Sequence, residues 1–171
     1  MNFAQAAIAL GSNLGDSLAT VKTALELLDS YPSITVKSHS SWYQTAPVGP
    51  PQPNYINGCA ILTVENTEKT PAQTAELLMQ TLLNVETQFG RVRRERWGPR
   101  TLDLDLLLFD DLILKTPTLE IPHPRMRERA FVLVPLAEIV PHWIDPVSGK
   151  DMTQLVEKID CFGVNKISED E

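Results

Sequence analysis

The sequence predicts an α+β fold in which one antiparallel sheet carries helices. Three observations predict this class. Short apolar runs rich in β-branched and aromatic residues are interleaved with two longer stretches whose apolar residues recur at helical spacing. Clusters of Pro, Gly and Asn separate these segments. The length of 171 residues suits one domain with a real core better than two, so residues 1–171 are expected to form a single domain.

The first half of the chain predicts a strand, a helix and two further strands. The apolar run Ala4–Leu10 ends at a Gly-Ser-Asn turn and is expected to be the first strand. A helical stripe follows and stops at Tyr31-Pro32. Strands are expected over Ile34–Tyr43 and Tyr55–Val64, on either side of the stiff proline-rich loop TAPVGPPQPN. The helical stripe consists of Leu18, Val21, Leu25 and Leu28.

The second half begins with a helix that carries its own start signal. Thr70 suits the N-cap, Pro71 the first helical position and Gln73 the third, and Gly90 is a natural stop. A strand is expected over Thr101–Phe109. The remaining expectations are a short apolar segment at Leu112–Leu114, helices near Phe131–Ile139 and Met152–Ile159, and a frayed tail over about 163–171.

The order of these elements predicts a topology. The succession β-α-β-β-α-β is that of a ferredoxin-like core, which has an antiparallel sheet and two helices on one face. The extra C-terminal helices are expected to cover the other face, giving three layers, α-β-α. We expect a monomer, although no feature of the sequence defines the oligomeric state.

Composition excludes several classes of protein. The net charge of −7 argues against a general nucleic-acid binder. No apolar stretch approaches the roughly 20 residues of a membrane helix, and the N-terminus lacks the basic region of a signal peptide. Cys59 and Cys161 lie far apart without metal-ligand spacing, as expected of reduced thiols. The sequence therefore predicts a cytoplasmic protein without membrane or nucleic-acid partners.

The arginines are unevenly distributed. The seven lysines are scattered, whereas every arginine falls in one window. The planar guanidinium suits bidentate binding of phosphate or carboxylate. Chance partition and an anion-binding site both stay open as explanations. The arginines are Arg91, Arg93, Arg94, Arg96, Arg100, Arg125, Arg127 and Arg129.

Two carboxylates interrupt the expected strand at its most apolar part. Alternation places Asp103, Asp105 and Leu107 on one face and the intervening leucines on the other. The two carboxylates then stand roughly 6.6–7 Å apart along the strand, a spacing that suits one or two small cations. Solvent-facing alternation at a sheet edge is the simpler alternative, but it leaves two poor strand formers in one strand unexplained.

Metal and arginine together predict a phosphate site. Mg²⁺ takes one or two carboxylates plus substrate phosphates, and upstream guanidinium groups would share the neutralisation of a polyphosphate. No P-loop pattern occurs. An RNA-binding module would need exposed aromatic residues and a positive sheet face, where this chain offers acids on a strand expected to be central. Another metal-dependent nucleotidyl or glycosyl transferase stays open on the residues alone.

The motifs resemble one known family. RWGPRTLDLDLL resembles the signature of the 6-hydroxymethyl-7,8-dihydropterin pyrophosphokinase family of the folate pathway. ALGSNLGD, SSWYQTAPVGPPQPNYINGCA, FGRVRRERWGPR and IPHPRMRERAFVLVPLAEI agree with it in the same order along nearly the whole chain. The resemblance implies transfer of pyrophosphate from ATP to the hydroxymethyl oxygen of the dihydropterin, which releases AMP.

The resemblance also implies roles for particular residues on the nucleotide side. Asp103 and Asp105 would bind two Mg²⁺ ions that bridge the ATP phosphates, and with Arg91 and Arg100 they would be catalytic. A mobile loop that includes Trp97 would close over the nucleotide and exclude water. The ATP-binding residues would be Arg91, Arg93, Trp97, Arg100, His123 and Arg129.

The pterin side follows from other segments. By the same resemblance, Tyr55 and Phe131 would sandwich the flat ring, Asn57 would hydrogen-bond its polar edge, and backbone groups around Thr45 and Val48 would contact the rest. Aromatic faces with a few fixed polar groups suit such a planar ligand.

Taken singly, many of these residues have simpler explanations. Tyr55 and Phe131 could be core aromatics, Asn57 could cap a bulge, and His123 could be a loop residue. Arg125 and Arg127 could form a solvated face. The chain departs from the family pattern at Leu83, Thr118, Pro124 and Ala46, of which the first three leave the adenine and ribose contacts undefined.

Overall fold

The computed structural model describes residues 2–13, 15–46, 54–89 and 101–167. Its main sheet has the order β5-β1-β4, and β4 then pairs with both β2 and β3 while β8 adds to β3. All of these pairings are antiparallel. This is the strand order of a ferredoxin-like core. The strands are β1 (Phe3–Ser12), β2 (Ile34–His39), β3 (Tyr43–Thr45), β4 (Tyr55–Glu65), β5 (Asp103–Phe109) and β8 (Asn165–Lys166).

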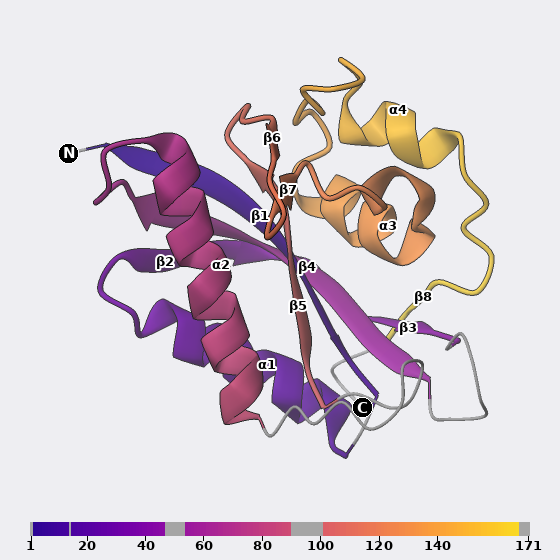
Figure 1. Cartoon of the computed structure of the whole chain (residues 1–171). Coiled ribbons are helices and arrows are strands. Elements are labelled where there is room, and N and C mark those ends of the chain that lie inside the picture. The colour runs from indigo at the N-terminus through magenta and orange to yellow at the C-terminus, as the bar shows by residue number, and fades with distance from the viewer. Residues whose placement is uncertain (1, 14, 47–53, 90–100, 168–171) are drawn as a thin grey trace.

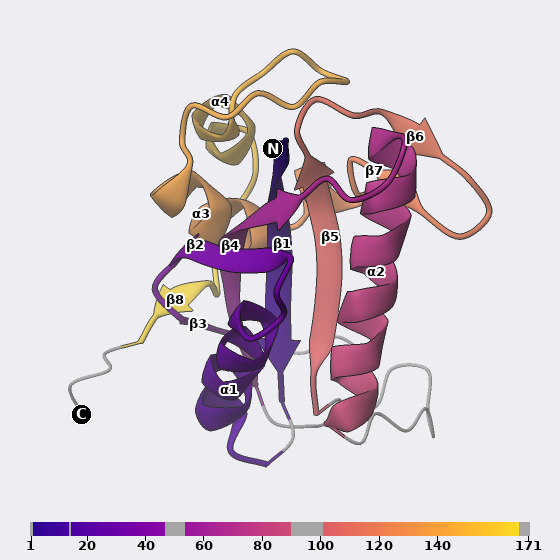
Figure 2. The ribbon, with the colours of Figure 1, turned by 90° about the vertical axis from the view of Figure 1, so that its left-hand side faces the viewer.

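Helices cover both faces of the sheet. Two helices, α1 (Ser17–Asp29) and α2 (Pro71–Gln88), lie on one face, and Figure 2 is turned so that this layer faces the viewer. On the opposite face lie α3 (Ala130–Ile139) and α4 (Met152–Glu157) (Figure 1). The expected α+β fold with three layers is therefore confirmed. The remaining elements are the hairpin β6 (Leu114–Lys115) and β7 (Glu120–Ile121) and the short turn η1 (Met126–Glu128).

Each face of the sheet has its own core. The larger core packs α1 and α2 against the strands and contains Trp42, whose side chain is fully buried. The smaller core packs α3 and α4 against the opposite face. Leu104 and Leu106 belong to the larger core, whereas Leu107 belongs to the smaller one. The alternation expected for this strand is therefore confirmed, and Asp103 and Asp105 share the face of α3.

The second expected strand is in fact two strands. Residues 34–43 divide between β2 and β3. Between the pairs His39–Ala60 and Tyr43–Asn57, the segment that joins β2 to β3 has one residue more than β4. At the break, Ser40 donates its amide to the Cys59 carbonyl at 2.8 Å, and its hydroxyl accepts from the Cys59 amide at 3.0 Å. The hydroxyl thus replaces a backbone acceptor where regular pairing is interrupted.

Two further expectations differ from the structure. The strand with the aspartates is not central, because β5 pairs only with β1 among the described strands of this sheet. Residues 165 and 166, placed in the expected frayed tail, form β8 against β3, and Ile167 donates to the Trp42 carbonyl at 3.0 Å. The Thr70–Gln73 capping box of α2 is present as expected.

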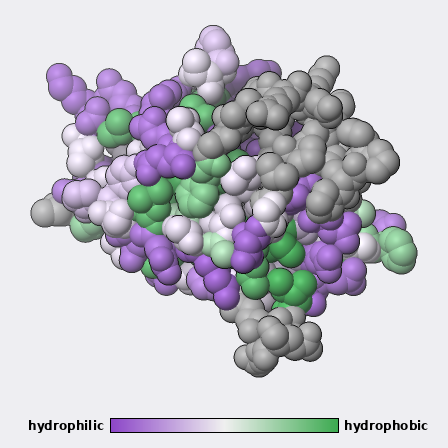
Figure 3. Space-filling model, turned by 90° about the horizontal axis from the view of Figure 1, so that it is seen from below, coloured by the Kyte–Doolittle hydropathy of each residue, from purple (hydrophilic) through white to green (hydrophobic). Residues whose placement is uncertain are grey.

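The surface carries no large segregated apolar face in the view from below. Hydrophilic and hydrophobic residues are interspersed across the coloured part of it (Figure 3). Among the described residues, no helix has both the length and the apolarity needed to cross a bilayer. Both cysteines are free, with Cys59 buried and Cys161 partly exposed.

Candidate active site

Two rows of residues run across the sheet on the face of α3. In the first row, Asp103 of β5 is paired in register with Gly11 of β1, and Gly11 with Asn57 of β4. In the second row, Asp105 is paired with Ala9, and Ala9 with Cys59. The acids on one strand and Asn57 on another are therefore separated only by the narrow strand β1, which presents no long side chain between them.

Gly11 leaves room in the middle of the first row. A Cβ atom at this position would lie 3.1 Å from Oδ1 of Asn57 and 3.7 Å from Cδ1 of Tyr55. The backbone of Gly11 has the extended conformation of the strand, so glycine matters at this position because it has no side chain. This absence keeps the surface between the carboxylates and the amide open.

Asp105 lies among cationic and ionisable side chains. Its Oδ1 is 3.8 Å from Nε2 of His123, and its Oδ2 is 3.9 Å from Nη1 of Arg129. The Asp105 side chain is 41% exposed, against 21% for His123 and 30% for Arg129. Both distances exceed those of direct hydrogen bonds, so the carboxylate retains oxygen lone pairs that face solvent. The structure thus brings together three of the residues expected at the nucleotide side.

His123 is held by its backbone and ring. Its amide donates to the carbonyl of Leu107 at 3.0 Å, on the strand edge that β1 does not use, and its Nδ1 accepts from the amide of Arg125 at 3.2 Å. The acceptor role of Nδ1 leaves the proton on Nε2, the atom that faces Asp105. Burial lowers the pKa of His123 below its usual 6.5, against the opposing effect of Asp105.

A buried glutamate fixes the main chain between the two aspartates. The amide of Leu104 donates to Oε2 of Glu86 at 2.8 Å, and Glu86 is only 3% exposed. Glu86 lies near the end of α2, so the hydrogen bond ties this helix to the open edge of β5. Sequence reasoning missed it, although a carboxylate four residues after Leu82 on an apolar helix stripe was a usable signal.

The described residues among those expected at the pterin side lie on the same face. Asn57 donates from Nδ2 to Oγ1 of Thr45 at 2.5 Å, and the two side chains are 8% and 7% exposed. Tyr55 is paired in register with Thr45. Phe131, near the start of α3, packs against the smaller core, and the guanidinium carbon of Arg129 lies 5.6 Å from its ring centroid.

Glu138 joins α3 to the sheet beside this region. Its carboxylate accepts from the hydroxyl of Tyr43 at 2.5 Å and from the amide and hydroxyl of Ser41 at 2.9 and 3.0 Å. Burial would raise the pKa of Glu138, but these hydrogen bonds outweigh it and the pKa is lowered. Tyr43 is in register with Asn57, so this contact fixes α3 relative to the row that contains Gly11.

For five of the expected site residues the structure gives no position. Val48, Arg91, Arg93, Trp97 and Arg100 lie outside the described residues.

Two arginines with a simpler alternative, and one position that departs from the family pattern, can now be placed. Arg125 is exposed, as expected for a solvated face, but Arg127 is not part of one, because it pairs with the buried Asp145. Thr118, where the family pattern has a basic residue, donates its hydroxyl to Glu76 of α2 at 3.1 Å.

The donor set suits magnesium shared with a substrate. Within the described parts of the chain, no group of three or more His, Cys, Asp or Glu side chains is arranged to hold a metal by itself. Two carboxylates on alternate positions of one strand are instead the kind of incomplete, all-oxygen set that Mg²⁺ completes with phosphate oxygens and water. The residues present therefore fit that ion.

Comparison with known proteins decides the family. A model of the 7,8-dihydro-6-hydroxymethylpterin-pyrophosphokinase family, HPPK, matches residues 7–141. The chain belongs to the HPPK family. A Synechocystis protein is 50% identical over 159 residues, which cover 93% of this chain and 78% of the relative, and a Bacillus subtilis protein is 46% identical over 134 residues, covering 77% and 75%. Both are named 2-amino-4-hydroxy-6-hydroxymethyldihydropteridine pyrophosphokinase.

Solved structures support the same fold. A Plasmodium falciparum HPPK-DHPS structure with pteroate matches with a TM-score of 0.63 at 12% identity, covering 92% of this chain. The chain spans 42% of that larger protein. At this identity the likeness concerns the fold alone, and it agrees with the HPPK assignment made from sequence.

Proposed function

We propose that Asp103, Asp105 and the residues around them carry out an Mg²⁺-dependent pyrophosphoryl transfer. The transfer itself follows from membership of the HPPK family. The chain is a transferase that moves pyrophosphate from ATP to the hydroxymethyl group of 6-hydroxymethyl-7,8-dihydropterin in folate biosynthesis. The products are the pterin diphosphate and AMP.

Asp103 and Asp105 hold two Mg²⁺ ions in this proposal. Their placement on one face of β5 and the exposure of Asp105 support it. The ions would supply neutralisation and alignment of the ATP phosphates. The buried Glu86 supports the metal site indirectly, because its hydrogen bond to Leu104 fixes the backbone from which both carboxylates project.

His123 and Arg129 bind ATP in this proposal. Both face Asp105 from one short segment, so a phosphate that shares a metal with Asp105 lies within reach of a guanidinium and an imidazole N–H. Charge on the transferred group is then balanced by fixed donors, which stabilises the transition state. Arg91, Arg93, Trp97 and Arg100, outside the described residues, complete the ATP site by resemblance to the family.

In this proposal the pterin binds at the β4 end of the two rows, opposite the aspartates of β5. Tyr55 and Phe131 supply aromatic faces, and Asn57 supplies polar atoms whose orientation is fixed by Thr45. Backbone groups near Thr45 and Val48 complete the contacts by resemblance. Because Gly11 keeps the intervening surface free, the hydroxymethyl group of a ligand on Asn57 can approach phosphates held at Asp103.

The observation that carries this proposal is the register Asp103–Gly11–Asn57 across three strands. It places a metal-binding acid and a heterocycle-binding amide on one face, with only a glycine between them. Such an arrangement suits a reaction between two bound substrates, one a metal-bound polyphosphate and the other a planar heterocycle.

An AMP-release assay tests the proposal. Purified protein is incubated with ATP and 6-hydroxymethyl-7,8-dihydropterin, with and without Mg²⁺. We expect AMP and pterin diphosphate in equal amounts, only when both substrates and Mg²⁺ are present. Full turnover after chelation of divalent metal would refute the metal assignment. We further propose that the protein is cytoplasmic, which its free cysteines support. We also propose that it acts on small molecules as a monomer, and light scattering of the purified chain tests the oligomeric state.

A further inference from the structure

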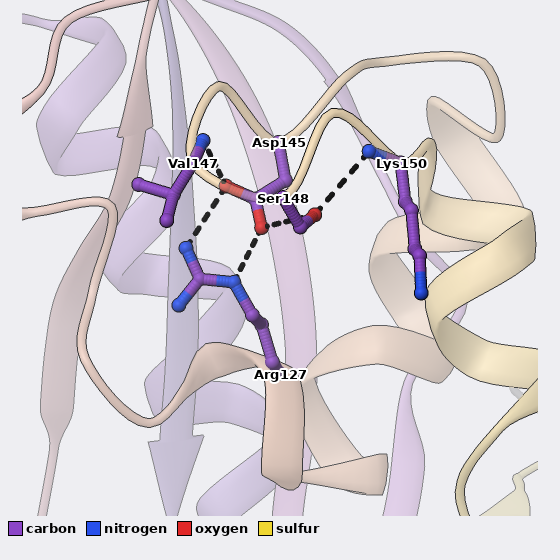
Figure 4. Close-up of polar contacts among 5 residues, drawn as sticks. All are labelled: Arg127, Asp145, Val147, Ser148 and Lys150. Atoms are coloured by element: carbon purple, nitrogen blue, oxygen red, sulfur yellow. Dashed lines mark hydrogen bonds and ion pairs between the residues drawn. The ribbon is translucent and has the colours of Figure 1, made fainter.

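An ion pair between the half-buried Arg127 and the buried Asp145 lies beside the ATP side of the site. The carboxylate of Asp145 is fully buried and accepts from four donors (Figure 4). Arg127 binds it through Nε and through Nη2, the latter at 2.9 Å, while the amide of Val147 and the hydroxyl of Ser148 donate at 3.0 and 2.8 Å. Burial opposes ionisation of Asp145, but these hydrogen bonds outweigh it and its pKa is lowered.

Arg127 belongs to the turn that connects His123 to Arg129. This turn is fixed at one end, where the His123 amide donates to the Leu107 carbonyl, and in the middle, where the side chain of Met126 is fully buried. After Met126, the side chain of Arg127 holds the turn in place through its hydrogen bonds to Asp145. Arg127 binds Asp145, whereas His123 and Arg129, at the two ends of the turn, lie 3.8 and 3.9 Å from Asp105.

The other half of the pair comes from a rigid loop. Asp145 donates its amide to the Lys150 carbonyl at 2.8 Å, and the Gly149 amide donates back to the Asp145 carbonyl at 2.8 Å. Gly149 has a φ of +75°, which a glycine adopts at little cost. The loop that holds the carboxylate is therefore closed by backbone hydrogen bonds that do not involve Arg127, so it can serve as a fixed reference for the turn.

We infer that Arg127 and Asp145 are positioning residues that orient His123 and Arg129 toward ATP. This inference rests on the proposed function, in which those two side chains bind the nucleotide. A bidentate arginine fixes the direction as well as the position of a backbone turn, because its planar fork meets the carboxylate in one orientation. Loss of the fork would leave His123 and Arg129 present but misaligned.

A purely stabilising role is the competing explanation, and variants can separate the two. Replacing both partners of a buried ion pair with apolar residues often preserves stability, but it removes the directional contact. Arg127→Met, Arg127→Lys and the double variant Arg127→Met/Asp145→Leu are compared with Lys150→Met. The Lys150 side chain points away from Asp145 in Figure 4, so this control removes one cation from the same loop without touching the pair.

The Michaelis constants for ATP and for dihydropterin are measured well below the melting temperature of each variant. We expect Arg127→Met to raise the Michaelis constant for ATP by about tenfold or more, with that for dihydropterin changed by less than about twofold. Arg127→Lys keeps the charge but not the planar fork, so its Michaelis constant for ATP should lie between those of wild type and Arg127→Met. If Arg127→Met does not fold, Arg127→Lys is the variant that tests the inference. The double variant should regain melting temperature but not ATP affinity.

Three results would overturn the inference. An unchanged Michaelis constant for ATP in both Arg127 variants excludes a positioning role. Recovery of ATP affinity together with melting temperature in the double variant shows that stability was the whole effect. A wild-type protein that releases no AMP overturns the proposed function, and this inference with it, whereas an active wild type with normal variants overturns the inference alone.

Discussion

Oδ2 of Asp105 lies 3.9 Å from Nη1 of Arg129. The two groups attract each other, yet this separation is too long for a direct hydrogen bond, and the carboxylate is 41% exposed. A structural ion pair would be expected to close to contact. This separation leaves room for a third, charged partner between the anion and the cation, as the proposed function requires.

Neutralising this carboxylate should abolish activity without unfolding the protein. Asp105→Asn keeps the shape of the side chain but would weaken the proposed metal site, so we expect kcat/KM for ATP to fall by about a hundredfold or more. AMP release at several Mg²⁺ concentrations measures the loss. Asp111→Asn, an exposed aspartate just beyond the same strand, is the matched control and should retain activity. A fully active Asp105→Asn protein would remove this residue from the metal site.

Filling the gap at Gly11 should impair pterin binding more than ATP binding. A methyl group there would lie 3.1 Å from Oδ1 of Asn57, so the Asn57 amide must shift by a few tenths of an ångström from the position in which Thr45 holds it. We expect Gly11→Ala to raise the Michaelis constant for dihydropterin by several-fold, on the order of 1 kcal/mol of lost binding, and Gly11→Val by more. Equal losses for both substrates would argue against Gly11 as a pterin-side residue.

A neighbouring glycine should instead affect stability. A Cβ atom at Gly58 would lie 2.5 Å from two ring atoms of the fully buried Trp42. We expect Gly58→Ala to lower the free energy of unfolding by about 1–3 kcal/mol, measured by urea denaturation, because the core is overpacked. In a Trp42→Leu background the cost of Gly58→Ala should shrink. An equal cost in both backgrounds would mean that the indole ring is not the cause.

Stability should fall in acid partly because of Glu138. Its pKa in the folded protein is lowered from the usual 4.5, so folding favours the ionised form. The stabilisation is therefore complete above pH 4.5 and is lost as the pH falls through that value toward the lower folded pKa. We expect the melting temperature of Glu138→Gln to depend less steeply on pH between about 3 and 5 than that of wild type. Glu157→Gln, at an exposed site, should keep the wild-type slope.

The sequence predicted the layers and the face of the aspartates for identifiable reasons. Alternation in the strand is a local property, and the leucines on either side of Asp105 report which face is buried. The capping box at Thr70 is also local, and it starts α2 where expected.

What the sequence did not predict depends on contacts between distant residues. The break between β2 and β3 arises where the hydroxyl of Ser40 accepts from Cys59, nineteen positions away, while local β propensity is continuous through it. In the sequence Arg127 is one of several cations expected on a solvated face, whereas in the structure it pairs with Asp145, eighteen positions later. Neither pairing has a short-range signature, because a serine or an arginine looks the same with or without its partner.

The irregular register at the end of β5 has a consequence for how this strand tolerates change. Pairing with β1 shifts between Ala7 and Ile8, so that both Leu107 and Leu108 pack into the smaller core. The shift accommodates one surplus residue, Leu107, two positions past Asp105. The bulge therefore leaves the acids on the face of α3, whereas a one-residue slip of the whole β5 register against β1 would turn both of them toward the face covered by α1 and α2.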